Sequence, residues 1–561
     1  MQPFSTDPNI NPFYYLDYLD YLLAFVAARY TPVLKAPERR RIKAFQALPK
    51  SARALYTRLL QRKGDYFRVD KLNYREIPDL QDAVAALIKA GFLNALGGER
   101  QDLCRSLRTI KELKHLGVLT ALGLANASRA LIEQGIKETG QVLPELAIVC
   151  VQEQTLMALC QHLFFGNEHQ DLSEFVLRDL GLQQFETVDL SVRPAFTERA
   201  DLDLLRLIGT LRRWAQALDL ERLKLKRSPN PENRAHLIET LTSLAAMVPA
   251  VCEHPLVIRA LNKLNLSLGL IFERCGHAPE ALLCYQKSDQ ATTLMRQAKL
   301  QIKTAPSLAL SICETIIKSS DDPEARHYAT RVLSAHQKQA PDEQTAPKPV
   351  ATKKISLALA GSTRVEQSAI EHFAEQGRAA VHIENHLYPA LFGLLFWEVI
   401  FMPIAGAFHH PFQRGPADLF EPDFGQLRTT QFAQRFKDLA ALNQRQQQLT
   451  ERFNEKFGLA NPFVHWSAIE LPWLLFVVTH TPWPALSAIF HRLLQNPRTF
   501  RTGFPDLVVF HETGYELIEV KGPGDRLQTH QTAWLTFLAE QGIQVSVLQI
   551  AKTNTQPVPN L

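Results

Sequence analysis

Two carboxylates and one lysine lie near one another in the C-terminal stretch 503–522. Asp506 directly precedes an apolar segment, and a second segment ends in Glu519 and Lys521. Because side chains alternate along a β-strand, Glu519 and Lys521 must emerge on the same face of their strand. The short link 511–514 predicts a hairpin, which brings Asp506 across from Glu519. The sequence therefore predicts that two carboxylates and one ammonium group converge.

This trio suits a phosphodiesterase that uses a divalent metal. A small, hard cation such as Mg²⁺ or Mn²⁺ prefers oxygen ligands and keeps several waters, so one or two carboxylates and a substrate phosphate can hold it. The metal would lower the pKa of a bound water, while Lys521 would orient that water or stabilise the developing oxyanion. A Glu-x-Lys pair alone is more often a solvated strand surface. Its combination with a preceding Pro-Asp strand and a turn favours the catalytic interpretation.

The stretch resembles the PD-(D/E)xK nuclease superfamily, its VRR-NUC branch and, within that, the Fanconi-associated nuclease family. The resemblance rests on Gly503-Phe-Pro-Asp-Leu-Val-Val509, Glu519-Val-Lys-Gly-Pro-Gly-Asp-Arg-Leu527, Gln531 and Trp534. Residues 527–541 have the pattern of an amphipathic helix with Gly542 just past its end, and residues 543–550 that of a strand. This order is the one expected of that nuclease core. The resemblance implies an α/β nuclease domain over residues 355–561.

Superfamily members commonly carry a third acidic metal ligand ahead of the Pro-Asp strand. The candidates by position are Glu366, Glu371, Glu375, Glu384 and Glu398. The resemblance selects Glu384, because Val381-His-Ile-Glu384-Asn-His matches the family segment that carries the upstream glutamate. Glu366 is the alternative, since other branches use a glutamate on the first helix. Glu398 lies inside an apolar run and suits a buried partner of an Arg or Lys.

The resemblance also implies a division of roles within the site. The expected ligands of one or two Mg²⁺ or Mn²⁺ ions are Glu384, Asp506, Glu519 and the backbone carbonyl of Val520. Lys521 would assist the attacking water, and Gln531 would orient water or phosphate from the next helix. Candidates for gripping the DNA backbone nearby are Arg498, Arg501, Arg526 and His530. Relatives can carry a lysine at position 530, so the histidine leaves open whether this chain grips a terminal 5′-phosphate.

Composition predicts a soluble chain of three or four domains. It has 561 residues, of which 46% are hydrophobic and 21% charged, and its net charge of +5 means that any nucleic-acid surface is local. Seven cysteines without a C-x-x-C pair favour a reducing compartment. Asp17 and Asp20 interrupt the first apolar segment, which argues against a signal peptide. The apolar runs 387–408 and 471–490 contain Glu or Pro, so we expect buried helices and no membrane span.

The most basic section is 35–75, which holds thirteen Lys and Arg against three Asp and Glu, a balance of +10. Such a face could bind DNA phosphates through counterion release, although a solvated helix surface explains the charge equally well. Helical spacing in 52–62 and 79–90 resembles the winged-helix-like module of the same family, which predicts an N-terminal domain over residues 1–100. Arg62 and Lys63 are its DNA-binding candidates.

Residues 101–138 resemble a SAP-type DNA-binding motif. Helical segments at 107–114, 116–124 and 128–133 place Leu and Ile on a buried stripe. If the likeness holds, the residues facing DNA phosphates are Arg105, Arg108, Lys111, Lys114 and Arg129.

The section 139–339 has a helical pattern throughout. Leu268, Gly269, Phe272, Ala281 and Tyr285 match the small and large positions of a tetratricopeptide (TPR) repeat. We expect a TPR-like scaffold that spaces the DNA-binding front from the nuclease or docks partner proteins. The Pro-rich residues 340–354 would form a linker.

Taken as a whole, the resemblance predicts a multidomain, mostly α-helical, structure-specific DNA nuclease. It would cut 5′ flaps and trim 5′ to 3′, as in interstrand crosslink repair, and would act in the cytoplasm or nucleoid, or in the nucleus of a eukaryote. One alternative is a Holliday-junction resolvase of the same superfamily. Another is a DNA-binding repeat scaffold with an idle nuclease core, against which the intact Asp506, Glu519 and Lys521 count.

Overall fold

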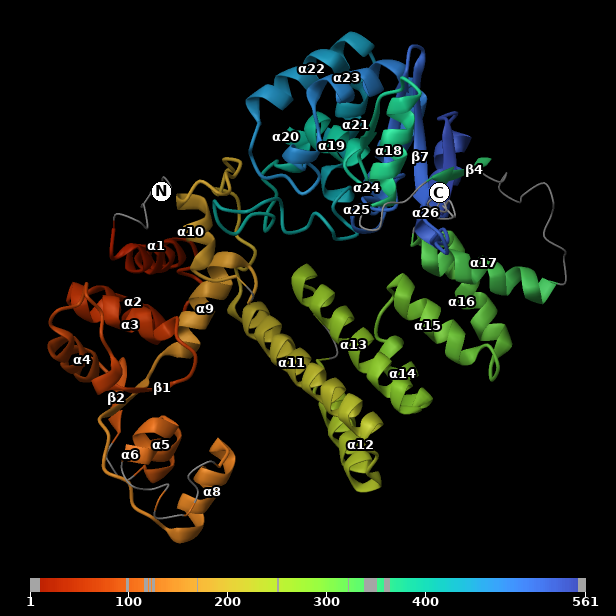
Figure 1. The fold of residues 1–561 in the computed structure, drawn as a ribbon. Coiled ribbons are helices and arrows are strands. Elements are labelled where there is room, and N and C mark those ends of the chain that lie inside the picture. The colour runs from red at the N-terminus through yellow and green to blue at the C-terminus, as the bar shows by residue number, and fades with distance from the viewer. Residues whose placement is uncertain are drawn as a thin grey trace, which may run out of the picture. The chain divides into compact units, whose positions relative to one another are not determined.

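The computed structural model describes residues 11–96, 100–115, 120, 123, 127–168, 170–249, 252–320, 322–337, 351–357 and 364–552. The chain forms two compact units (Figure 1). One comprises Met1–Gln184 with His409–Phe412, and the other Phe185–Phe408 with Gln413–Leu561.

The first unit is built on helices α1 (Tyr14–Arg29), α2 (Ala36–Gln46), α3 (Lys50–Leu60) and α4 (Leu80–Lys89). A three-stranded antiparallel sheet in the order β1 (Tyr66–Arg68), β3 (Ile148–Val151), β2 (Leu93–Leu96) accompanies them. Rings of Phe45, Tyr56 and Phe92 pack edge-on or tilted at the centre of the helices and sheet. The two predicted helices of the winged-helix-like module are therefore present as α3 and α4.

Strand β3 corrects the expectation that residues 139–339 are helical throughout. Its residues Ile148–Val151 pair with both β1 and β2, so the SAP-like segment is an insertion between two strands of the N-terminal sheet. Helices α9 (Gln154–Phe165) and α10 (Ser173–Asp179) follow in the same unit. A strand of four residues is too short to show a recognisable periodicity among helices. Its pairing partners also lie more than fifty residues earlier, so no local hairpin signal marks it.

The SAP-like segment contains α5 (Gln101–Ser106), α6 (Ile110–His115) and α8 (Arg129–Thr139) around a small core that includes Leu113, Ile132 and Ile136. Most of the helix expected over 116–124 lies outside the described residues.

Two of the expected phosphate-binding arginines have structural roles instead. The Arg108 side chain is buried and donates to the backbone oxygens of Cys104 at 2.8 Å and Pro144 at 2.6 Å. Arg129 donates to the carbonyls of Arg105, Ser106 and Arg108 and pairs with Glu133. Both guanidinium groups are thus bonded to backbone carbonyls in the last turn of α5 and in the connecting segments, which a charge count could not reveal.

Replacing Arg108 with Ala should loosen this segment. Its two charged hydrogen bonds are worth about 2 kcal/mol, so amide hydrogen exchange in 101–115 and 129–139 should accelerate by roughly thirtyfold. The matched control is Lys111→Ala, since Lys111 is exposed on α6. If both variants exchange like the parent chain, Arg108 does not hold the segment together.

In the described residues of the second unit, seven helices make up the repeat section. They are α11 (Arg199–Arg227), α12 (Pro231–Ala246), α13 (Pro255–Cys275), α14 (Ala278–Tyr285), α15 (Ala291–Gln301), α16 (Pro306–Ser319) and α17 (Pro323–Gln337). Gly269 lies against the ring of Tyr285, where an added Cβ would come within 2.3 Å of a ring carbon. This small-against-large contact is the one that the spacing predicted; the assignment to TPR repeats stays a prediction.

Apolar helices also raise the question of a membrane span. Among the described residues, α13 alone has the length and composition to cross a membrane, and α23 (Leu471–His480) with α24 (Trp483–Gln495) would make a second only as a pair bent by 116°. Residues of α13 such as Leu264, Leu268 and Phe272 are buried in the core of the repeat section.

The nuclease half contains a five-stranded mixed sheet in the order β4 (Ala351–Leu357), β8 (Val545–Lys552), β7 (Gly514–Lys521), β6 (Leu507–His511), β5 (Ala380–His382). β4 and β7 run parallel to β8, whereas β6 runs antiparallel to both of its neighbours, β7 and β5. Residues 351–354, assigned to the linker, are instead the first part of β4. The remainder of that linker, 340–350, lies outside the described residues.

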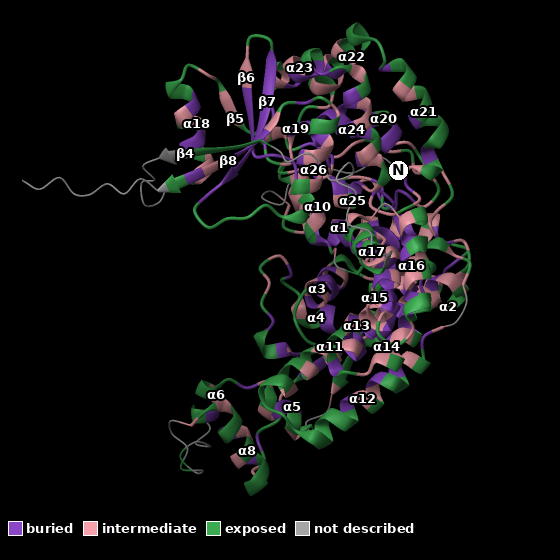
Figure 2. Cartoon of the chain, turned by 90° about the vertical axis from the view of Figure 1, so that its right-hand side faces the viewer, coloured by how far each residue is buried: buried purple, intermediate pink, exposed green. Residues whose placement is uncertain are grey.

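Helices cover both faces of this sheet, and β7 is buried along its whole length (Figure 2). Helix α18 (Val365–Glu375) packs on the face formed by Leu507, Val509, Ile518 and Val520. The other face, with Val508 and Leu517, joins the core of α19 (Leu387–Leu395), α23, α24 and α26 (Thr529–Glu540). The remaining helices of this half are α20 (Trp397–Ile400), α21 (Thr429–Asp438), α22 (Leu442–Glu455) and α25 (Pro497–Phe500).

Candidate active site

The hairpin of β6 and β7 brings Asp506 and Glu519 together as predicted. Leu507 pairs with Ile518, so Asp506 and Glu519 follow as the next opposed positions of the ladder. The backbone N–H of Val520 donates to Asp506 Oδ2 at 2.7 Å, which fixes this carboxylate against β7. By strand alternation, Glu519 shares the face of Leu517, which is opposite α18, and the bond from Val520 holds Asp506, which precedes β6, beside it.

Lys521 completes the predicted trio. Its Nζ donates to Glu519 Oε1 at 2.6 Å and to Gln531 Oε1 at 3.2 Å. Glu519 is fully buried and Lys521 nearly so. The same oxygen of Gln531 accepts the N–H of Gln528 at 3.0 Å, in the capping box that begins α26. Gln531 thus links the first turn of α26 to the Lys521 ammonium group and helps to position it. The sequence placed Gln531 in the same pocket.

Glu384 reaches the site from the segment that follows β5. The N–H of Ile383 donates to the carbonyl oxygen of Asp506 at 2.8 Å. Asn385 has a left-handed backbone, with φ of 58°, and its Oδ1 accepts the N–H groups of Gly503 at 2.7 Å and Phe504 at 3.1 Å. The residues directly before and after Glu384 are therefore both hydrogen-bonded to the segment 503–506. Sequence reasoning assigned no role to Asn385, although asparagine is among the residues that tolerate this backbone conformation best.

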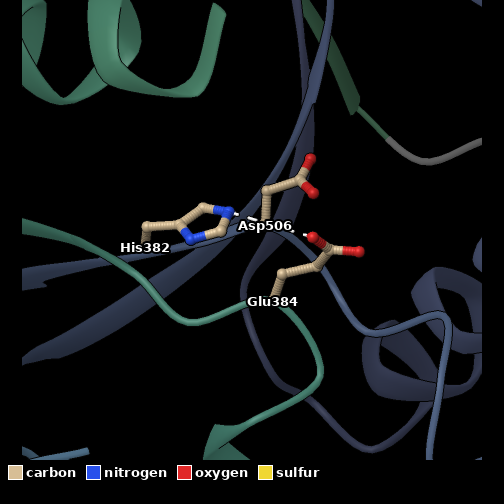
Figure 3. Close-up of side chains that lie close together, drawn as sticks. All are labelled: His382, Glu384 and Asp506. Atoms are coloured by element: carbon tan, nitrogen blue, oxygen red, sulfur yellow. Dashed lines mark ion pairs between the residues drawn. The ribbon is translucent and has the colours of Figure 1, made fainter. Parts of the chain in front are cut away.

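His382 is a second neighbour that sequence reasoning did not single out. One ligand atom from each of His382, Glu384 and Asp506 lies within 4.8 Å of the other two (Figure 3). His382 and Glu384 are exposed, whereas Asp506 is buried. The signal that could have found His382 is its spacing, because it stands two residues before Glu384 at the end of a strand.

The other acidic candidates are separated by the fold. Glu366 lies in the first turn of α18, which covers the opposite face of the sheet, and its effect on the pKa of Asp506 is smaller than that of Glu384. Glu398 forms an ion pair with Arg452, as expected of a structural residue, but it is half exposed and not buried. These positions favour Glu384 as the upstream carboxylate.

Without a bound cation, the site disfavours the ionised forms of Asp506 and Glu519. Burial, with the nearby Glu384 carboxylate, raises the pKa of Asp506 to about 6 even though the Val520 N–H opposes the shift. Burial and the charge of Asp506 raise the pKa of Glu519 to about 7 despite the hydrogen bond from Lys521. A cation placed among these groups would offset the repulsion.

One atom in the site lacks a partner that a metal would supply. Glu519 Oε2 is buried, and no hydrogen bond to it is formed among the described residues. A buried carboxylate oxygen without a partner is costly. Oxygen donors from Asp506, Glu519 and Glu384 form the kind of set that hard divalent cations prefer. The residues present therefore fit a divalent metal.

The predicted DNA-gripping residues lie in several places. Arg498 and Arg526 are exposed, Arg501 stacks on the ring of Phe420, and His530 packs against Gly503. In the first unit, Arg62 contacts Tyr74 and lines a cavity of about 380 Å³ with Arg58 and Lys71. Lys63 lines a neighbouring cavity of about 450 Å³. The remaining predicted contacts in the SAP-like segment are the exposed Lys111 and Lys114 and the half-buried Arg105.

Two domain families match the chain. The model described as "FAN1, HTH domain" matches residues 13–94, and the VRR-NUC domain matches residues 442–552. The second match contains Asp506, Glu519, Lys521 and Gln531, whereas Glu384 lies ahead of it.

Whole-chain comparisons agree with the domain matches. A protein of Pseudomonas aeruginosa described as "Fanconi-associated nuclease 1 homolog" is 33% identical, over 96% of this chain and 96% of its own length. An Arabidopsis thaliana relative of the same description is 23% identical, over 94% of this chain and 66% of its own length. A solved structure described as "Crystal structure of paFAN1 bound to 2nt 5'flap DNA with gap" superposes with a TM-score of 0.83 at 30% identity, covering 98% of this chain and all of that one. From this similarity and the geometry of its site, the chain belongs to the Fanconi-associated nuclease family and is a DNA nuclease whose site takes a divalent metal.

Proposed function

We propose that this chain is a structure-specific endonuclease that cuts 5′ flaps and related branched DNA, trims DNA 5′ to 3′, and serves in interstrand crosslink repair. The observation that carries the proposal is the buried trio of Asp506, Glu519 and Lys521, with the unpartnered Glu519 Oε2. It is supported by two solved structures of one similar protein, at 30% identity, which are described as bound to 5′-flap DNA with flaps of one and two nucleotides.

The residues of the site divide between binding and positioning. Asp506, Glu519, Glu384 and the carbonyl of Val520 would hold one or two Mg²⁺ or Mn²⁺ ions, which supply positive charge and a water of lowered pKa. Lys521 Nζ, held by Glu519 and Gln531, is placed to donate a hydrogen bond to the attacking water or to a phosphate oxygen. Gln531 fixes the direction of the Lys521 side chain. As water bonds to phosphorus, the phosphodiester bond to the leaving strand breaks.

The role of Glu384 can be separated from that of Glu366. Because Glu384 lies beside Asp506 and Glu366 begins the helix on the other face, Glu384→Gln should lower cleavage by at least a hundredfold while Glu366→Gln changes it only a few fold. The measurement is single-turnover cleavage of a 5′-flap duplex in Mn²⁺. An inactive Glu366→Gln beside an active Glu384→Gln would transfer the ligand role to α18.

DNA affinity would come from exposed basic groups other than Lys521. Arg62, Lys63, Lys111, Lys114, Arg498 and Arg526 are the proposed phosphate contacts that the structure leaves exposed, with Arg105 and Arg501 less accessible. Neutralising one phosphate contact should reduce the dependence of log K on log salt by about one unit. The helical repeats α11–α17 are proposed to dock repair proteins, in the cytoplasm and nucleoid or in a nucleus.

A substrate panel tests the proposed specificity. The chain, incubated with Mn²⁺ or Mg²⁺, should cut a 5′-flap duplex at least tenfold faster than a 3′-flap or a four-way junction of the same sequence. Faster and symmetric cutting of the four-way junction would identify a resolvase instead. Absence of cutting on every substrate would leave a DNA-binding scaffold with an idle core.

A further inference from the structure

His382 lies where a nitrogen donor could reach the position between Glu384 and Asp506. It is the last residue of β5, where it pairs with Leu507, the residue directly after Asp506. The backbone bond from Ile383 to the Asp506 carbonyl continues this ladder by one residue. His382 and Glu384 are therefore carried by backbone that is fixed to the Asp506 strand, and Figure 3 shows their side chains with that of Asp506.

The ligand atoms of His382, Glu384 and Asp506 are too far apart to bond one another but close enough to bind one cation. His382 Nε2 and Glu384 Oε2 are 3.9 Å apart, which is beyond hydrogen-bonding range. Two ligands of one octahedral cation with bonds of about 2.1 Å lie roughly 3 to 4 Å apart. The three ligand atoms, all within 4.8 Å of one another, thus need only small side-chain rotations to meet at one ion.

The donors on the two sides of Asp506 differ in chemistry. Toward β7, the groups are oxygens only: Glu519 with its unpartnered Oε2, and the carbonyl of Val520. Toward β5, an imidazole joins the Glu384 carboxylate. Oxygen-only sets suit Mg²⁺, whereas an imidazole improves the fit of first-row transition ions.

We propose that His382 is a nitrogen ligand of the cation held by Glu384 and Asp506, and that it biases this position from Mg²⁺ toward Mn²⁺ and other first-row transition ions. This inference rests on the proposed metal-dependent function. It adds a histidine to the proposed ligands, whose side chains are otherwise all carboxylates. Within the described part of the chain, the His382 side chain lies 3.9 Å from Glu384 and makes no side-chain hydrogen bond, so replacing it removes none.

Electron spin echo spectroscopy of bound Mn²⁺ tests this directly, because a coordinated imidazole gives a ¹⁴N modulation that a carboxylate cannot. The full chain, free of any histidine tag, should show this modulation with one equivalent of Mn²⁺ and lose it in His382→Asn. The control is His372→Asn, since His372 bonds Gln376 on α18 and belongs to no such group. It should keep the signal.

A second measurement gives the change in selectivity. Calorimetric titration should show that His382→Asn weakens Mn²⁺ binding by about tenfold or more and Mg²⁺ binding by much less. Modulation that persists in His382→Asn, or equal weakening of both ions, would overturn the role of His382 while leaving metal binding intact. Failure of the parent chain to bind Mn²⁺ at all would overturn the proposed function together with this inference.

Discussion

Replacing Lys521 with Met should lower the rate of flap cleavage by about a thousandfold while the affinity for flap DNA changes only a few fold. The ammonium is buried beside Glu519 and held by Gln531, so it can act on a developing negative charge without first being reoriented. Removing a preorganised donor of this kind costs about a hundredfold to a thousandfold, and loss of help to the attacking water adds to that. Single-turnover cleavage in saturating Mn²⁺, with DNA binding measured in Ca²⁺, separates the two effects.

The same sheet offers a matched control. Lys353 on β4 makes a comparable ion pair, from Nζ to Glu516 Oε1 at 2.7 Å, but it is half exposed and lies on an edge strand that β8 separates from β7. Lys353→Met should therefore cleave at nearly the parent rate. An active Lys521→Met would mean that the reaction does not need this ammonium group. An equally inactive Lys353→Met would mean that loss of either ion pair acts through folding and not through the reaction.

The hairpin could be predicted because its rules are local. Alternation along β7 requires Glu519 and Lys521 to share a face, and a two-residue turn at Glu512 and Thr513 sets the register that opposes Asp506 to Glu519. The helix and strand after it also lie within two residues of their expected limits, as α26 and β8.

The choice between Glu384 and Glu366 could not be made from spacing. Both precede the Pro-Asp strand, and only the packing of α18 on the opposite face distinguishes them. The residue type of Asn385 permits its left-handed conformation, but nothing near it in the sequence showed that its side chain would hold the backbone before Asp506. His382 was missed for the same reason, since its value depends on a neighbour more than a hundred residues later.

In the N-terminal unit, counting Lys and Arg residues did not identify which of them are free to contact DNA. Arg108 and Arg129 have the same sequence signature as Lys111 and Lys114, but their guanidinium groups bond backbone carbonyls of the SAP-like segment and of Pro144 just after it. An arginine offers five donors to several acceptors at once, so it can bridge helix ends in a way that a lysine cannot. The insertion of that segment before β3 was also hidden, because β-pairing between distant strands leaves no local periodicity.

The raised pKa values predict that the active site destabilises the metal-free protein. Burial favours the protonated form of Asp506, so its pKa is about 6 in the folded chain against an ordinary value of 3.8. For an acid with a raised folded pKa, the associated stability is present below pH 3.8 and is lost as pH rises through 6. A shift of about two units corresponds to roughly 3 kcal/mol, an upper limit because Glu519 titrates together with Asp506.

Asp506→Asn should consequently make the metal-free chain more stable at neutral pH. Asparagine keeps an oxygen for the Val520 N–H but removes the buried charge. In EDTA, the stability gap in favour of the variant should be small near pH 4.5, grow up to about pH 6.5 and stay constant at about 1 to 3 kcal/mol above it. Thermal unfolding of the nuclease half as a function of pH measures this gap.

Adding Mn²⁺ should reverse the order of the two proteins at pH 7.5. The cation stabilises the parent chain by mass action, and Asp506→Asn lacks a ligand common to every proposed metal position. Asp525→Asn is the matched control, because Asp525 is exposed and accepts only the Gly522 N–H at 3.0 Å, so it should follow the parent under both conditions. A parent chain that outlasts Asp506→Asn in EDTA would show that the charge at Asp506 is stabilised by the fold itself, and that the cation is not needed to offset it.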